Sequence, residues 1–286
     1  PEGAQASAVG HGHGLKGSEQ DLHLHRRPLY RLVGLSREQL LLARRYARGY
    51  KEEKRPHRSY PIKGLYLMGS MGSLGQTAGS DLDFWLCHSG DLDAAGRESL
   101  RRKAERLEQR AAEIGLHAHF FVMHAEAFRD GQVEQLSKES SGNTQHTLLL
   151  EEFYRTGLLL AGNPPLWWVV PPEHENEYTE YTQRLIGRRF IRADRWLDFG
   201  GLHTLPAREF FGVAHWQLFK GIDAPYKSLL KLMLLEAYAA EYPKVDWLCM
   251  ETKRAVHGSG ELDADGLDPY QLILERITRY LLARNE

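Results

Sequence analysis

The sequence has few cysteines, no long apolar run and almost no net charge, and each of these absences excludes a class of protein. Only two of the 286 residues are cysteine, so a disulfide framework is excluded and a reducing, cytoplasmic location is expected. No apolar stretch approaches the roughly 18 to 20 residues that span a bilayer, so we expect no transmembrane segment. The formal net charge of −1 argues against a protein that binds nucleic acid nonspecifically.

What remains is the composition of a folded chain with a substantial core. Hydrophobic residues make up 42% of the chain, which suits one large domain or two ordinary ones. Residues 1–28 are rich in Gly, Ser, Ala and His without periodicity and predict a flexible arm. Residues 29–172 mix short apolar strands with helices, whereas residues 173–286 carry apolar residues mainly at helical spacing. We expect an α+β fold in which a mixed β-sheet with helices precedes an all-helical domain.

The expected elements follow from periodicity and from Gly and Pro at their ends. Strands are predicted over 65–68, 82–87 and 116–123, with two further short strands between 157 and 170. Helices are predicted over 97–114, 146–156, 174–188, 207–220, 226–240 and 268–284.

Two carboxylates stand out on the second predicted strand. Side chains alternate between the faces of a strand, so Asp81, Asp83 and Trp85 share one face and Leu82 and Phe84 the other. We expect the leucine and phenylalanine face to form the core. Two carboxylates held this close repel one another unless a cation joins them. Mg²⁺ suits the role, because it takes oxygen ligands and prefers one or two carboxylates together with substrate phosphates.

A segment of small residues precedes this strand and suits a phosphate. Ser70 lies eleven residues before Asp81 and follows Gly69, directly after an apolar strand. Glycine lets the backbone approach a phosphate closely, and the serine hydroxyl and adjacent N–H groups can donate to its oxygens. A helical turn within residues 71–78 would favour the same anion. The chain has no G-x-x-x-x-G-K-[ST] sequence, so a P-loop is excluded.

Each signal is weak alone, and their combination carries the interpretation. A D-x-D sequence often occurs in surface turns, and Asp91-Leu92-Asp93, in a Gly-flanked loop, reads as a solvated one. The combination of glycine-serine and D-x-D between two apolar strands suits a nucleoside triphosphate bound with a divalent cation.

This arrangement resembles the nucleotidyltransferases of the DNA polymerase beta superfamily. The longer string MGSMGSLGQTAGSDLDFWLCH resembles more narrowly the catalytic region of class I adenylate cyclases of the enterobacterial type. Further matches are GNTQHTLLLEEFYRTGLLLAG, WLDFGGL, WQLFKGIDAPYKSLLKLMLLEAY and LDPYQLILERITRYL, so the resemblance covers about residues 60–284. Family members are longer and have a carboxy-terminal regulatory region, so we interpret this chain as the amino-terminal catalytic part, with regulatory protein partners left open.

The resemblance implies a nucleotidyltransferase-like fold and a reaction in which ATP becomes cyclic AMP and pyrophosphate. Asp81 and Asp83 would hold Mg²⁺, with Mn²⁺ as an alternative. Gly69 and Ser70 would cradle the β- and γ-phosphates, and Ser80 would be a second polar contact beside the metal. Trp85 would line the nucleotide pocket, although a place in the core suits it equally.

The third strand departs from the wider superfamily, whose members usually carry a third carboxylate there. Residues 116–124 contain no acid, and His119 stands at about the expected position. A neutral imidazole can accept a proton near pH 7, so His119 is a candidate catalytic base. The alternative is that His117 and His119 only fill the exposed face of an alternating strand.

The predicted helix over 226–240 offers cations for the triphosphate. Lys227 and Lys231 are four residues apart and share a helix face, and Tyr226 could stack on adenine. Lysines on an amphipathic helix are also commonly solvated, and the resemblance is what favours the phosphate role. Arg155 follows Glu151 at the same spacing, which an ordinary surface pair explains.

Two other functions compete with adenylate cyclase. A nucleotidyltransferase that moves AMP to an acceptor would have a similar metal site, because only the nucleophile differs. A module that senses a nucleotide without turnover is favoured by the third strand, which lacks an acid.

Overall fold

A computed structural model describes most of the chain after residue 59. The described residues are 41, 45, 60–131, 145–202, 205–258 and 267–285. All the elements below belong to the unit formed by residues 32–286. The predicted arm over residues 1–28 lies outside the described residues.

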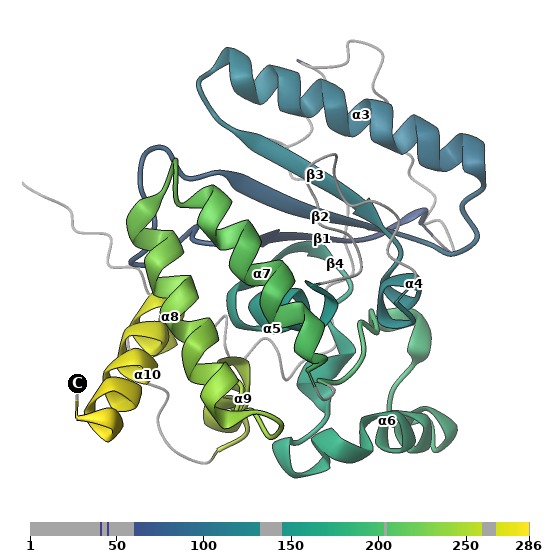
Figure 1. Ribbon diagram of the computed structural model, residues 1–286. Helices are drawn as coiled ribbons and strands as arrows, with labels where there is room; N and C mark the ends of the chain where they lie inside the picture. The colour runs from purple at the N-terminus through teal and green to yellow at the C-terminus, as the bar shows by residue number, and fades with distance from the viewer. Residues whose placement is uncertain are drawn as a thin grey trace, which may run out of the picture. The chain divides into compact units, whose positions relative to one another are not determined.

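Four described strands form one mixed sheet. They are β1 (Ile62–Met68), β2 (Leu82–His88), β3 (Ala118–Met123) and β4 (Leu158–Gly162), in the order β3-β2-β1-β4 (Figure 1). Strand β1 pairs antiparallel with both β2 and β4, and β3 runs parallel to β2. A sheet with helices on it confirms the predicted α+β class.

Helix α3 (Ala94–Glu113) makes the parallel pairing of β2 and β3 possible, because parallel neighbours need a crossover connection. Asp93, predicted to lie in a solvated turn, caps the helix instead by accepting a hydrogen bond from the Gly96 N–H at 2.7 Å. After the helix, Gly115 adopts a φ of 77°, the left-handed conformation expected of a glycine that follows a helix. The crossover brings residue 119 alongside residue 83.

Helices dominate the rest of the described chain. They are α4 (Ala125–Arg129), α5 (His146–Thr156), α6 (Tyr178–Gly187), α7 (Ala207–Lys220), α8 (Pro225–Glu241), α9 (Leu248–His257) and α10 (Pro269–Arg284). Short 3-10 segments are η2 (Leu166–Val169), η3 (Pro172–Glu177) and η4 (Ala193–Arg195). None of the helices in the described ranges has the length and hydrophobicity needed to cross a bilayer.

Most predicted elements are confirmed, and the exceptions are short. The second of the two strands predicted before residue 170 is wrong, because Leu166–Val169 forms the 3-10 segment η2. Helices α4 and α9 were not predicted. The division into a first domain ending at residue 172 and a second one beginning at residue 173 stays a prediction.

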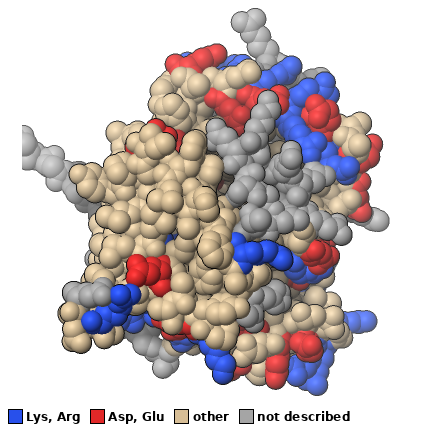
Figure 2. Space-filling model, viewed as in Figure 1, with Lys and Arg blue, Asp and Glu red and all other residues tan. Residues whose placement is uncertain are grey.

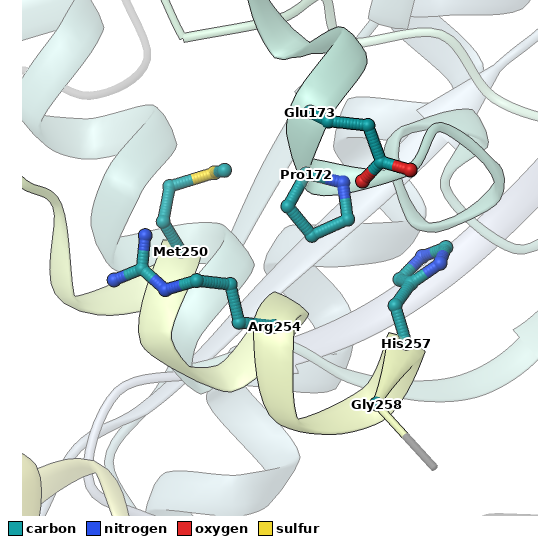
Figure 3. A pocket seen from close by; sticks show the side chains of 6 residues that line it. All are labelled: Pro172, Glu173, Met250, Arg254, His257 and Gly258. Atoms are coloured by element: carbon teal, nitrogen blue, oxygen red, sulfur yellow. The ribbon is translucent and has the colours of Figure 1, made fainter.

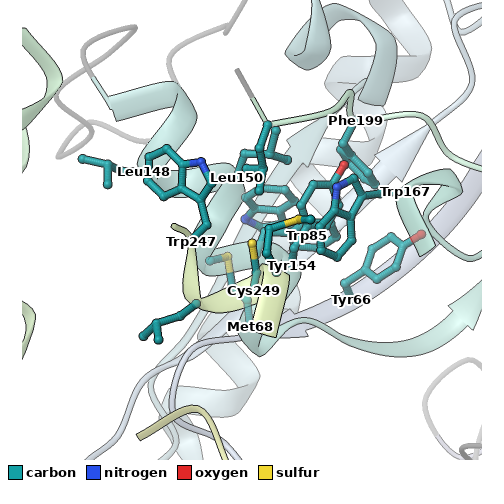
Figure 4. Close-up of a cluster of buried hydrophobic side chains, with 14 of the residues drawn as sticks. Tyr66, Met68, Trp85, Leu148, Leu150, Tyr154, Trp167, Phe199, Trp247 and Cys249 are labelled. Carbon is teal, nitrogen blue, oxygen red and sulfur yellow. The ribbon is translucent and has the colours of Figure 1, made fainter. Parts of the chain in front are cut away.

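The main core lies on the sheet face that carries Trp85. This indole lies among the buried hydrophobic side chains of Figure 4 and is only 2% exposed. It stacks on Phe153 of α5, with ring centroids 4.3 Å apart. Tyr66, its cross-strand neighbour on β1, packs edge-on against the same phenylalanine at 5.2 Å. The expectation that the Leu82 and Phe84 face forms the core was therefore incomplete. Both faces of the sheet are covered, one by α5 and the other by α3 (Figure 1).

A buried ionic network holds α5 to the helices behind it. Arg155 binds Glu151 at 2.9 Å, and the side chains are only 4% and 3% exposed. The Tyr238 hydroxyl and the Cys249 N–H also donate to Glu151, each at 3.3 Å. The Glu151–Arg155 pair was predicted from its spacing, but its assignment to the surface was wrong, because α8 and α9 cover that face of α5.

The surface in the view of Figure 2 divides by charge. Charged side chains gather over α3, whereas a broad area over α7 and α8 is largely without them. Exposed hydrophobic side chains of this second area belong to α7, α8 and the turn between them: Phe211, Leu218, Phe219, Ile222, Tyr226 and Leu229.

Candidate functional site

The loop between β1 and β2 is built from tight turns. Gly69 has a φ of 99°, a conformation that a side chain would strain, and its N–H donates to Thr156 Oγ1 at 3.1 Å. Three backbone bonds of the i to i+3 type follow one another, ending on Ser73, Gln76 and Ser80. The helical turn considered for residues 71–78 is absent from this described segment, so no helix N-terminus faces an anion there.

The two carboxylates lie at the beginning of β2. Asp81 is exposed just before the strand, and Asp83 is partly buried opposite Met68 of β1. A Cβ built on Gly69 would lie 3.9 Å from Asp83 Oδ2, so the loop backbone approaches this carboxylate closely. No other described residue hydrogen-bonds to either carboxylate or forms an ion pair with it.

Electrostatics leave Asp83 short of positive charge. Burial raises the pKa of the Asp83 carboxyl, and the charges of Asp81 and Glu152 raise it further, while His119 and Lys231 lower it in part. The net effect is a pKa above the usual value for an aspartate. A carboxylate in such a position gains from a bound cation, which is the condition that two paired carboxylates create.

His119 lies beside Asp83 on the neighbouring strand. The parallel register pairs the two residues directly, which places their side chains on one face of the sheet. His119 is exposed and therefore accessible to a ligand over the carboxylates. The position of His119 is as predicted. The register does not decide between its two suggested roles, a catalytic base and an ordinary exposed side chain of the strand.

Lys227 joins the loop to α8. Its Nζ donates to Ser80 Oγ at 2.8 Å and to Ser70 Oγ at 3.1 Å, and Ser70 Oγ donates to Ser80 Oγ at 3.2 Å. No carboxylate among the described residues lies within ion-pair distance of this nitrogen. Burial and the charge of Lys231 lower the pKa of Lys227, although the charge of Asp81 opposes them. The two serines and the lysine predicted from sequence thus meet at one point.

Lys231 is one helical turn further along α8 and has a different environment. Its Nζ pairs with Glu152 Oε1 at 2.6 Å, and the two side chains are 27% and 23% exposed. Burial lowers the pKa of Lys231, but the charge of Glu152 outweighs it, so that the pKa is raised. The charge of Lys231 is therefore already compensated by an acid, unlike that of Lys227.

Trp85 and Tyr226 lie apart from this cluster. Trp85 is enclosed by the aromatic core, so of its two suggested roles the structure favours the core, and its predicted place in a nucleotide pocket is not supported. Tyr226 is 84% exposed on α8, directly before Lys227. It is accessible to a base and has no ring contact in the described structure.

Sequence reasoning missed four residues that shape the site. They are Glu152, which pairs with Lys231; Thr156, which accepts from Gly69; and Asp268 and Tyr270, which contact the loop tip. All four lie within the strings on which the family resemblance rests. Their polar character inside long matching strings was the available signal, but only the tertiary fold shows what they touch.

The carboxylates form a pair and not a larger cluster. In the described ranges no group of three or more His, Cys, Asp or Glu side chains is arranged to hold a metal. Two carboxylates are the protein ligands that Mg²⁺ accepts when a substrate phosphate supplies further oxygens. The residues present therefore fit a cation that arrives together with a nucleotide.

A pocket of about 500 Å³ lies elsewhere, between η3 and α9 (Figure 3). Its lining includes Glu173, Met250, Arg254 and His257. The Arg254 guanidinium already bonds Asp246 at 3.0 Å, and the His257 ring bonds the Trp168 carbonyl oxygen at 3.0 Å. None of the predicted site residues lines this pocket, so it has no part in the site.

Comparison with known proteins adds independent information. The adenylate cyclase NT domain matches residues 33–168, and the second domain of class I adenylate cyclase matches residues 205–286. The adenylate cyclase of Escherichia coli strain K12 is 45% identical over 236 residues, which cover 82% of this chain and 28% of that protein. That of Yersinia intermedia is 47% identical over 226 residues, 79% of this chain and 26% of that protein.

Among solved structures, spectinomycin adenyltransferase from Enterococcus faecialis with ATP and spectinomycin aligns with a TM-score of 0.34 and 14% identity. It covers 77% of this chain and 92% of that one. A similarity of this size carries no argument about function. The two domain matches are informative, because the first domain precedes the second along the chain. Together they include the loop serines, the two carboxylates, His119 and Lys227. The chain spans about 28% of the length of the Escherichia coli protein. It belongs to the class I adenylate cyclase family.

Proposed function

We propose that this chain forms the catalytic part of an adenylate cyclase, which converts ATP to 3′,5′-cyclic AMP and pyrophosphate. The observation that carries the proposal is the meeting of Ser70, Ser80 and Lys227 beside Asp81 and Asp83, two carboxylates that no described residue pairs with. Phosphate oxygens need donors and a compensating positive charge, and this cluster offers both. Membership in the family supplies the reaction.

In this proposal the triphosphate lies along the loop. The Lys227 ammonium and the hydroxyls of Ser70 and Ser80 donate to the β- and γ-phosphate oxygens, in place of the bonds that they now make to one another. Gly69 lets the backbone approach closely because no side chain projects there. The exposed Tyr226 ring covers the adenine, and Lys231 acts through the local field, since Glu152 already occupies its ammonium group.

Asp81 and Asp83 would hold a divalent cation, which we propose to be Mg²⁺, with Mn²⁺ as an alternative. When bound, the cation would lower the pKa of the ribose hydroxyl and neutralise charge on the leaving pyrophosphate. The chain's own contribution is to hold both carboxylates at the beginning of β2, with Asp83 beside the loop backbone at Gly69. Their mutual repulsion is then compensated only in the loaded site.

The reaction requires a proton acceptor at the ribose 3′-oxygen. That oxygen forms a bond to the α-phosphorus, the bond from this phosphorus to the bridging oxygen of pyrophosphate breaks, and the hydroxyl proton leaves. His119 is exposed beside Asp83 and can accept this proton as a neutral imidazole. Lys227 stabilises the charge that grows on the departing pyrophosphate, so the two residues act at opposite ends of the transfer.

Incubating the whole chain with ATP labelled at the α-phosphate and Mg²⁺ tests the proposal. Free labelled cyclic AMP together with pyrophosphate is the expected result. Label found on a protein, nucleic acid or small acceptor would instead assign an AMP transferase. Calorimetric binding of ATP without any product would assign a nucleotide-sensing module, and either outcome overturns the proposal.

We also propose that the chain works in the cytoplasm. Both cysteines, Cys87 and Cys249, are free and buried, and burial raises the pKa of each thiol. Such thiols are inert hydrophobic side chains, which suits a reducing compartment. Cell fractionation of the natural host with an antibody to this chain tests the location.

A further inference from the structure

The tip of the loop between β1 and β2 is fastened by the last described helix of the chain. The Leu74 N–H donates to Asp268 Oδ2 at 2.9 Å, although these residues are 194 positions apart. The other oxygen of the same carboxylate, Oδ1, accepts from Tyr270 N–H at 2.8 Å and from Gln271 N–H at 3.1 Å. Asp268 is thus the N-cap of α10 and at the same time a partner of the loop.

A second contact supports the loop tip from the same helix turn. The Tyr270 side chain is 7% exposed and packs against the backbone of Gly75. A Cβ built on Gly75 would lie 2.4 Å from Tyr270 Cε2 and 2.5 Å from Cζ, closer than any side chain could approach. Gly75 is therefore required by the close contact of the loop backbone with the tyrosine ring and not by a positive φ.

The tyrosine also extends this support to the charged part of the site. Burial raises the pKa of the Tyr270 hydroxyl, and Glu152 raises it while Lys231 lowers it. The ring contacts the loop tip, and its hydroxyl is within electrostatic range of the Glu152–Lys231 pair. Helix α10 packs against α8, which carries Lys227 and Lys231, so the support has a rigid base.

These contacts matter because little else among the described residues holds the tip. Leu74 is 71% exposed, and Gln76 is also exposed; its Oε1 accepts from the Gly72 N–H at 2.8 Å within the loop itself. The base of the loop is held by Thr156 and Lys227, at Gly69 and at the two serines. The tip is held from α10. A loop that contributes donors to a phosphate loses affinity when its shape is not held in advance.

We propose that Asp268 and Tyr270 are positioning residues that hold the loop of residues 69–80 in the shape that receives the triphosphate of ATP. This inference rests on the proposed function. It assigns to α10, within the second family domain, a role in substrate binding that acts through the loop and not through contact with the nucleotide.

The first test separates the loop contact from the helix cap. In Asp268→Ser the shorter side chain can still cap α10, because serine is a good N-cap, but it cannot also reach the Leu74 N–H. We expect the dissociation constant of a nonhydrolysable ATP analogue, measured by calorimetry with Mg²⁺, to rise about three- to tenfold, the loss typical of one hydrogen bond. The KM for ATP should rise similarly, while kcat changes less.

Glu275→Gln is the matched control, since Glu275 is exposed on the same helix and its carboxylate bonds, among the described residues, only to the Gln271 side chain of that helix. The control should bind the analogue as the unchanged chain does. Asp268→Ser with unchanged analogue binding and an unchanged KM would overturn the inference. Failure of the unchanged chain to bind the analogue would count against the proposed function itself, so the two failures are distinguishable.

The second test uses two glycines of the same loop. Gly75→Ala should weaken analogue binding by about tenfold or more, because the new methyl group displaces the tip from Tyr270. Gly79→Ala should have a smaller effect, because a Cβ there meets nothing within 4 Å. In the double variant Gly75→Ala, Tyr270→Leu the ring that collides with the new methyl group is gone, so part of the lost binding should return. The thermal unfolding midpoint of the double variant shows whether it is folded. Equal effects of the two alanine variants would contradict the proposal.

Discussion

Helix α5 borders two polar regions that differ in whether their charged side chains are paired. Behind the helix, Glu151 is bonded by Arg155, Tyr238 and Cys249, so every member of that buried network has a partner. In front of it, Asp81, Asp83 and Lys227 lie close together without forming an ion pair. The first region is complete in the folded chain, whereas the second gains its missing interactions only from a ligand. Full compensation indicates a structural role, and incomplete compensation indicates a binding site.

The largest effect that sharpens this comparison is expected from Asp83→Asn. Turnover of ATP should fall by more than about 100-fold. That is the upper end of the loss seen when a residue that only supports a metal ligand is replaced, and Asp83 is proposed to be a ligand itself. Stability should stay unchanged or increase, because the burial and like charges that raise the pKa of Asp83 no longer act on a neutral amide. Cyclic AMP production and urea unfolding measure the two quantities.

Asp91→Asn provides the control for this substitution, since Asp91 belongs to the second D-x-D of the chain and is exposed. Its turnover should match that of the unchanged chain. Comparable activity of Asp83→Asn and Asp91→Asn would remove Asp83 from the site.

The converse experiment breaks the buried region. Arg155→Met should lower the free energy of unfolding by about 3 to 5 kcal/mol, because it leaves the buried Glu151 carboxylate without its cation. Arg192→Met, which removes an exposed guanidinium paired with Asp194 at 2.7 Å, should leave the free energy of unfolding nearly unchanged, because water screens an exposed pair. Urea unfolding curves compare the two variants. Equal losses would mean that burial does not distinguish the pairs.

Lys227 and Lys231 offer the same contrast on one helix. Lys227→Met should raise the KM for ATP about ten- to a hundredfold, the value of one or two hydrogen bonds to a charged phosphate, with little change in stability. Lys231→Met should mainly lower stability, because it removes the ion-pair partner of Glu152. Steady-state kinetics and thermal unfolding of both variants test the contrast, and identical profiles would contradict it.

The smallest expected effect concerns pH. Burial raises the pKa of Glu152, but the charges of Lys231 and Arg155 outweigh it, so the pKa lies below its ordinary value of 4.5. The folded state therefore binds this proton less tightly than the unfolded state. The pair stabilises the fold above about pH 5, and the contribution is lost as the pH falls through the lowered pKa.

Glu152→Gln lacks this contribution, so the stability difference between it and the unchanged chain should shrink toward acid pH. For a partly exposed pair we expect the difference to be less than about 1 kcal/mol. Urea unfolding between pH 7 and pH 3 measures it, and a difference that grows toward acid pH would reverse the assigned sign.

Local patterns and the family resemblance together predicted which residues would lie near one another. Alternation along β2 put Asp81 and Asp83 together at the strand's beginning, and the resemblance singled out His119 on the third strand, which the register pairs with Asp83. Helical spacing brought Lys227 and Lys231 onto one face. What alternation could not decide was which face of the sheet meets the main core, because helices cover both. Trp85 therefore went to the core although it shares a face with the carboxylates.

Contacts between distant segments were beyond the reach of such patterns. The spacing of Glu151 and Arg155 predicted their pairing, but only the packing of α8 and α9 against α5 buries it. Similarly, Glu152 becomes the partner of Lys231 only where α5 meets α8. The bond from Leu74 to Asp268 depends on the same long-range packing, and neither residue shows this in its local sequence.

The indole of Trp167 has a consequence for how the gene can be divided. It is fully buried, stacks on Tyr154 at 4.1 Å and carries the Lys253 ammonium 4.0 Å above its ring. That lysine, itself 0% exposed, is anchored by Glu175 at 2.7 Å. A truncated product ending at residue 168 would lack Lys253 and so expose the Trp167 ring. One starting at residue 205 would lack both Trp167 and Glu175, the two partners of the Lys253 ammonium. We therefore expect the two segments to fold together, as a single cooperative unit.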